Sequence, residues 1–248
     1  MQQVTRLPRP VATTIVAALL ACAAAAWLVT AQQAASMTDG VAMMGAGLFL
    51  VTWLLMMVAM MFPSVAPMTL AFASMTRLRG DASAATVVFV LGYLAVWALS
   101  GLVPLGVQQA VNQIWMSPPS WLPRAGGAVI ILAGIYQLTP LKDTCLGACR
   151  SPLGFVMTHN FGGGLPAALR AGASHGLYCV GCCWGLMAVL AVLGLMNLAW
   201  MAVIAAVFFT EKNVHRGDVL PRVVGAACIA GGLAILAWPI LLAAPTTM

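Results

Sequence analysis

The chain has 248 residues, of which 62% are hydrophobic and only 6% are charged. About a quarter of the residues in a typical soluble domain are charged, so a soluble fold of this size could not bury so much apolar surface. Composition therefore predicts an all-α, polytopic membrane protein with one transmembrane domain over residues 1–248 and the lipid bilayer as a partner. The net charge of +6 bears on membrane topology and gives no reason to expect a nucleic-acid partner.

The first apolar run, from about residue 11 to residue 31, follows Arg6 and Arg9. This arrangement is shared by signal peptides and first membrane spans, and residues 19–22 (LLAC) resemble a lipoprotein cleavage site. The run is longer than a signal-peptide core of roughly 7–15 residues and is long enough to cross the bilayer. We therefore expect an uncleaved first span.

Seven apolar segments are expected to cross the membrane. They lie near residues 11–31, 43–66, 84–108, 125–141, 173–193, 198–210 and 223–243. Ten of the eleven basic residues precede the first segment or follow the second, fourth or sixth, and Arg124 alone lies on the other side. Basic loops stay in the cytoplasm, which predicts an N-terminus inside and a C-terminus outside. Residues 142–172 then form a cytoplasmic linker.

The second segment carries methionines beside two prolines. Met57 and Met61 share one helical face, Met60 lies beside them, and Pro63 and Pro67 follow. Thioethers are soft, uncharged ligands that suit Cu(I), and helix-interrupting prolines in membranes often line cavities. The alternative is that the methionines only fill apolar space.

The predicted cytoplasmic linker begins with KDTCLGACRSP, in which Cys145 and Cys149 are four residues apart. One helical turn would align their thiols. The spacing also fits a disulfide, a redox pair or chance, although a reducing cytoplasm disfavours a structural disulfide. His159, alone in a glycine-rich stretch, is expected to face solvent.

The fifth segment begins with the densest group of metal-binding side chains, in HGLYCVGCCWGLM. At 100° per residue His175, Cys179 and Cys182 fall within about 60° of each other, with Cys183 at the edge. This pattern predicts metal or redox use, and the alternative is that the cysteines are small packing residues.

A short turn near residues 194–197 should make the fifth and sixth segments antiparallel neighbours, which puts Glu211 near the level of Cys179. Glu211 is then a candidate ligand, a proton acceptor, the partner of Lys212 or a solvated interface charge. At about 1.5 Å of rise per residue, the methionines 57–61 lie in a similar half of the membrane. We expect the two sulfur-bearing faces to meet.

Three stretches together resemble a bacterial family of uncharacterised proteins: MMVAMMFPSVAP, YQLTPLKDTCLGACRSPLGF, and HGLYCVGCCWGLM followed by MNLAWMAVIAAVFFTEK. Its members are described as predicted metal-binding integral membrane proteins and are sometimes labelled copper chaperones. The resemblance covers roughly residues 43–215 and implies a multi-pass protein of the bacterial cytoplasmic (inner) membrane. It implies that the family's motif positions are Met57, Met60, Met61, Cys145, Cys149, His175, Cys179, Cys182, Cys183 and Glu211. Cys22 and Cys228 lie outside the motifs, and we expect them to be packing residues.

The first functional hypothesis is binding of a thiophilic metal, Cu(I) before zinc, for transport, delivery or metal-centre assembly. The cysteines would bind, the methionines would relay, and His175 or Glu211 would complete the site or manage protons. Haem ranks lower because only three histidines are present. The rival is a membrane thiol oxidoreductase or electron-transfer subunit, and a structural subunit is the non-catalytic default. Expected partners are the metal ion and a metallochaperone, a metalloenzyme client or another membrane subunit.

Overall fold

The computed structural model describes residues 7–36, 45–112, 121–151, 154–155, 163–195, 197–214 and 219–238, and their regular structure is helical. In chain order the helices are α1 (Arg9–Ser36), α2 (Ala46–Thr76), α3 (Ala82–Ser100), α4 (Leu102–Asn112), α5 (Leu122–Gln137), α6 (Pro140–Arg150), α8 (Gly164–Leu193), α9 (Leu198–Asn213) and α10 (Val219–Ala237). The predicted all-α class is confirmed.

Each of the seven predicted apolar segments overlaps a helix. Among the described residues, five helical stretches are long and apolar enough to cross a membrane: α1, α2, α3 continued by α4 over Ala82–Ala110, α8 and α10. The pair α5 and α6, bent by 63°, would make a sixth. Helix α9 has 16 residues, fewer than the roughly 20 that a perpendicular span needs. Several apolar spans are thus present, while seven crossings and their orientation stay predictions.

The predicted linker 142–172 is helical at both of its ends. Helix α6 occupies its beginning, and α8 starts at Gly164. Pro140 stands at the start of α6, where its missing N–H costs nothing, and the Thr139 side chain accepts a hydrogen bond from the Lys142 amide at 3.4 Å. A second, short helix therefore follows α5 after a bend of 63°.

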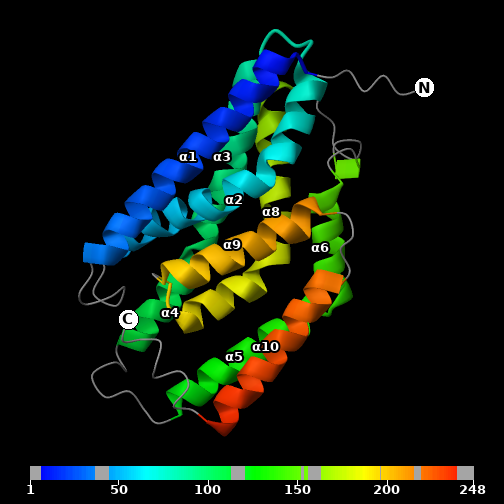
Figure 1. Cartoon of the computed structure of the whole chain (residues 1–248). Helices are drawn as coiled ribbons and strands as arrows, with labels where there is room; N and C mark the ends of the chain where they lie inside the picture. The colour runs from blue at the N-terminus through cyan, green and yellow to red at the C-terminus, as the bar shows by residue number, and fades with distance from the viewer. Residues whose placement is uncertain are drawn as a thin grey trace.

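Helix α8 lies at the centre of the fold and contacts α3, α5, α6 and α9. Its approach to α3 is close: a Cβ at Gly172 would overlap the Phe89 carbonyl, and one at Gly92 would overlap the Leu169 carbonyl. Small residues allow this backbone contact between apolar helices. In Figure 1, α9 crosses in front of α8, α6 lies beside them, and α5 and α10 pair at the lower end of the view.

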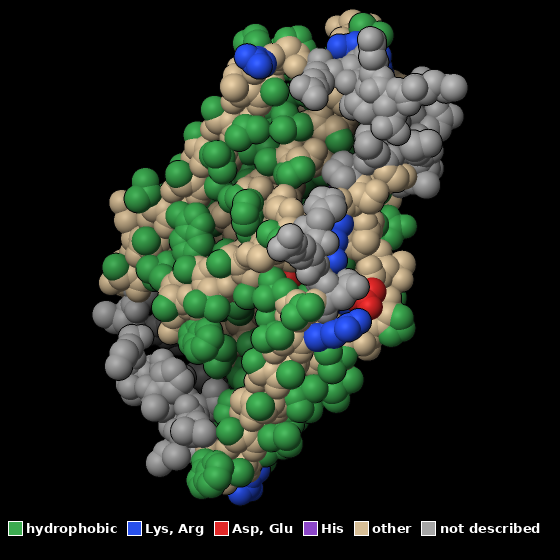
Figure 2. Space-filling model, turned by 45° about the vertical axis from the view of Figure 1, so that its right-hand side comes forward, with side chains coloured by type: hydrophobic (Ala, Val, Ile, Leu, Met, Phe, Trp, Pro, Cys, Tyr) green, Lys and Arg blue, Asp and Glu red, His purple; other side chains and the backbone are tan. Residues whose placement is uncertain are grey.

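The outer surface of the bundle is largely apolar. Leu28, Val103, Leu132 and Leu177 are all more than 60% exposed, and Figure 2 shows hydrophobic side chains over most of the face in view, with Lys and Arg at only a few points. Such a surface is compatible with insertion in a membrane.

The connection between α2 and α3 has a contrasting, polar character. Arg79 donates two hydrogen bonds to the Asp81 carboxylate, at 2.8 and 2.7 Å. These bonds stabilise the charged carboxylate and lower the pKa of Asp81 below its usual value. A solvated ion pair therefore marks this end of the α2–α3 hairpin, in one of the loops predicted to be cytoplasmic.

Candidate metal centre

Three cysteines of α8 form a buried cluster. The Sγ atoms of Cys179, Cys182 and Cys183 all lie within 4.8 Å of one another, and those of Cys182 and Cys183 are 3.5 Å apart. The i, i+3, i+4 spacing on one helical face produces this triangle. A metal bound at about 2.3 Å from each sulfur would hold its ligands at similar separations, so the cluster can accept one soft ion.

A fourth thiol approaches the cluster from α6. Cys149 Sγ lies 3.9 Å from Cys182 Sγ. Cys145, one turn earlier, packs on α8 where Gly181 leaves room, since a Cβ there would come within 2.7 Å of the Cys145 sulfur. The predicted alignment of the two thiols is therefore present, and both face α8. All seven cysteines are free thiols.

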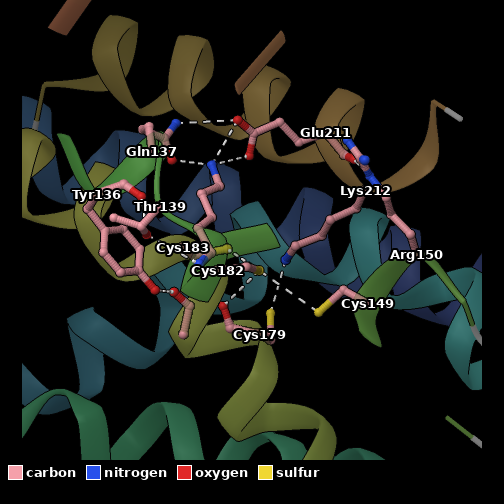
Figure 3. A network of polar contacts seen from close by, with 12 residues as sticks. Tyr136, Gln137, Thr139, Cys149, Arg150, Cys179, Cys182, Cys183, Glu211 and Lys212 are labelled. Carbon is pink, nitrogen blue, oxygen red and sulfur yellow. Dashed lines mark hydrogen bonds and ion pairs between the residues drawn. The ribbon is translucent and has the colours of Figure 1, made fainter. Parts of the chain in front are cut away.

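An ion pair with almost no exposure to solvent holds α6 against α9. Lys142 Nζ donates to the two carboxylate oxygens of Glu211 at 2.9 and 2.8 Å, and it also donates to the Gln137 side chain. Gln137 Nε2 donates to Glu211 at 3.3 Å, and Arg150 Nε donates to the Glu211 carbonyl oxygen at 2.6 Å. Figure 3 shows this network beside the cysteines.

The network shows which basic residue pairs with Glu211, for which the sequence suggests Lys212. Its carboxylate pairs with Lys142 and not with Lys212. Lys142, which the charge count assigns to a cytoplasmic loop, is completely buried. The reason is geometric, because the bend after α5 turns the first residues of α6 inward toward α9.

Lys212 is a residue of this site that the sequence does not single out. Its Nζ lies 3.0 Å from Cys179 Sγ and 3.5 Å from Met61 Sδ. The end of the sixth segment therefore lies beside Cys179, as predicted, but the residue that reaches Cys179 is Lys212 and not Glu211. A helix turns by 100° per residue, so Glu211 and Lys212 face different neighbours. The sequence feature that could have pointed to Lys212 is its charge in the last turn of an apolar helix.

The methionines of α2 are buried close to this point. Met57 and Met61 are 0% exposed and Met60 is 1% exposed. The Lys212 ammonium contacts both Met61 and Cys179 and so lies between the thioether face and the thiol face, while direct contact of the two faces stays a prediction. Pro63 and Pro67 lie inside α2, which continues through both of them.

His175 is buried among aromatic rings one turn before Cys179. Its ring centroid lies 5.7 Å from that of Tyr93, 6.2 Å from that of Phe89 and 5.3 Å from that of Phe155. Within the described residues, the group of clustered ligand atoms consists of cysteines and does not include His175. Tyr93, which the sequence does not single out either, places its Oη 3.1 Å from Cys179 Sγ. His159 and His215 lie outside the described residues.

Comparison with known proteins identifies the family. A family model described as "Copper chaperone" (PpoB2) matches residues 50–235, which is 186 of the 248 residues. No curated protein and no solved structure matches the chain. The matched region contains the clustered cysteines, both cysteines of α6, the methionines and Glu211. The chain belongs to the copper chaperone family.

Proposed function

We propose that this protein is a multi-pass membrane protein that binds Cu(I) at Cys179, Cys182 and Cys183 and delivers it to a partner. The observation that carries the proposal is the buried triangle of three sulfur atoms within 4.8 Å of one another. Thiolates are soft ligands that suit Cu(I). The family match supports copper as the ion, and the apolar helices support a site within the bilayer.

The surrounding residues have distinct roles in this proposal. Cys149 is the thiol that receives the ion from the cluster or passes the ion to it, because Cys149 reaches Cys182 from a different helix. Met57, Met60 and Met61 form the neutral relay, since Met61 shares the Lys212 contact with Cys179 and thioethers hold Cu(I) without adding charge. Zinc is the competing ion because it also binds thiolate sets, and buried thioethers favour copper.

Glu211 and His175 act on the site from outside the ligand shell. The Glu211 carboxylate is engaged by Lys142 and Gln137, so we assign it the positioning of α6 and not metal binding. His175 stacks on Tyr93, and Tyr93 Oη contacts Cys179. This chain of contacts orients the Cys179 thiol, as partners of metal ligands commonly do.

Thiol redox chemistry is the second candidate, and the Cys149–Cys182 contact favours it. The two sulfur atoms are 3.9 Å apart, and closing to the disulfide distance of about 2.05 Å needs only a small shift. Forming the S–S bond would release two electrons and two protons, which a membrane quinone would accept. Such a cycle has no chemical need for the buried methionines.

The proposal is tested by the metal content of the detergent-purified protein, prepared without chelators. The wild type should carry copper, and the Cys179→Ala/Cys182→Ala variant should lose most of it while staying folded, because little volume is removed. The matched control is Cys22→Ala/Cys228→Ala, which removes two cysteines outside the cluster and should retain copper. Unchanged copper in a folded Cys179→Ala/Cys182→Ala protein would refute the assignment. A copper-free wild type whose Cys149–Cys182 pair oxidises reversibly would support the redox candidate instead.

A further inference from the structure

The Lys212 side chain presents an ammonium group to sulfur atoms in the interior of the protein. The residue is only 7% exposed. Its Nζ lies 3.0 Å from Cys179 Sγ, 3.5 Å from Met61 Sδ and 5.8 Å from the centroid of the Phe208 ring. A charge in such surroundings is costly unless a partner compensates it, so its position needs a reason.

The ordinary reasons for a buried lysine do not apply here. Within the described part of the chain no carboxylate forms an ion pair with Lys212, because Glu211 pairs with Lys142, Asp81 pairs with Arg79, and Asp143 is exposed to solvent. Lysines near helix ends usually extend toward water, whereas Figure 3 shows the Lys212 side chain directed at Cys179. The sulfur cluster itself is therefore the counterpart of this charge.

We propose that Lys212 is a positioning and charge-compensating residue of the copper centre. The inference rests on the proposed function and deepens it. Three thiolates around one Cu(I) give a complex of charge −2, since −3 + 1 = −2, and the neighbouring ammonium reduces the net charge to −1. The N–H groups of Lys212 also hold the Cys179 sulfur in place from α9, and Cys149 of α6 contacts Cys182 of the same cluster.

The contribution of the Lys212 charge to Cu(I) affinity can be estimated from electrostatics. Unit charges about 5 Å apart, at an effective dielectric constant of about 20, interact strongly enough to change an affinity on the order of a hundredfold. Removing a group that supports a metal ligand typically weakens metal binding by about 10- to 100-fold. We therefore expect the loss of the Lys212 charge to weaken Cu(I) binding by about 10- to 100-fold.

The experiment measures Cu(I) affinity of the full-length protein in detergent, by competition with a chromophoric Cu(I) chelator under anaerobic conditions. Lys212→Gln should bind about 10- to 100-fold more weakly than the wild type and shift the sulfur-to-copper charge-transfer band. Lys212→Arg keeps the charge and should restore most of the affinity. Arg170→Gln is the matched control, because it removes one positive charge from an exposed position of α8 and should leave the affinity unchanged.

The outcomes separate this inference from the proposed function. A wild type that binds no Cu(I) would refute the proposed function itself. A wild type that binds Cu(I), with equal affinity in folded Lys212→Gln, would overturn the role of Lys212 alone. Lys212→Leu provides a second test if the glutamine variant folds poorly, because replacing a buried charged group by an apolar residue of similar volume is often neutral or stabilising. Wild-type affinity in Lys212→Leu would likewise overturn the inference, and weakened binding would support it.

Discussion

The Lys142–Glu211 ion pair should contribute strongly to the stability of the protein and to the position of Cys149. The side chains are 0% and 2% exposed, so replacing Glu211 by Gln leaves the Lys142 ammonium buried without its counter-ion. Breaking such a pair on one side costs about 3–5 kcal/mol. Replacing both partners, as in Lys142→Met/Glu211→Leu, removes both charges and should cost far less than the sum of the two single changes.

The assay is SDS-induced unfolding in mixed micelles for the wild type, Lys142→Met, Glu211→Leu and the double variant, analysed as a double-mutant cycle. The expected coupling free energy is several kcal/mol. Asp81→Asn breaks the solvated Arg79–Asp81 pair and should change the free energy of unfolding far less, which makes it the control. The single variants should also slow oxidative cross-linking of Cys149 to Cys182, because α6 loses its attachment to α9. Single variants that each cost less than about 1 kcal/mol would refute the reasoning.

Two further predictions concern the methionines and the topology. Replacing Met57, Met60 and Met61 by Leu should leave a folded protein, since such swaps usually cost less than about 1.5 kcal/mol each, but should impair copper loading, measured beside thermal stability. Intact copper handling in that variant, together with loss of activity in Cys182→Ser, would favour the thiol-redox candidate. A reporter fused after Met248 should be active outside the cytoplasm, and one inserted in 142–172 should be active inside. The opposite pattern would overturn the predicted orientation of the thiols.

The helical architecture could be predicted from the sequence because apolar segments of this length leave few alternatives to membrane helices. The second, short helix after α5 could not be predicted in the same way. Residues 142–150 are polar in part and fall in the predicted linker, where the cysteine spacing allows one helical turn. The 63° bend that turns Lys142 inward depends on packing against α8 and α9. Consequently Lys142 was counted as a loop charge, although it is buried in an ion pair.

The cysteine cluster follows from spacing alone, since positions i, i+3 and i+4 share one helical face. The shared level of Met61 and Cys179, which both contact Lys212, could also be predicted from the short turn before α9 and the rise per residue. The roles of Glu211 and Lys212 could not be predicted, because a 100° difference around α9 decides which of the two side chains reaches Cys179. The aromatic rings around His175 come from two separate parts of the chain, α3 and residues 154–155, and the α3 rings reach His175 because α3 and α8 pack closely.

The most direct test of the central claim is X-ray absorption at the copper K-edge on protein loaded with one equivalent of Cu(I). Copper bound by these thiols should give a Cu(I) edge and a first shell of sulfur atoms, with copper–sulfur distances of about 2.3 Å. Substituting Cys179 and Cys182 should abolish this shell, whereas substituting His175 should leave its sulfur composition unchanged. A first shell dominated by nitrogen or oxygen, or a sulfur shell that survives loss of both cysteines, would contradict a copper centre built on the Cys179, Cys182 and Cys183 thiols.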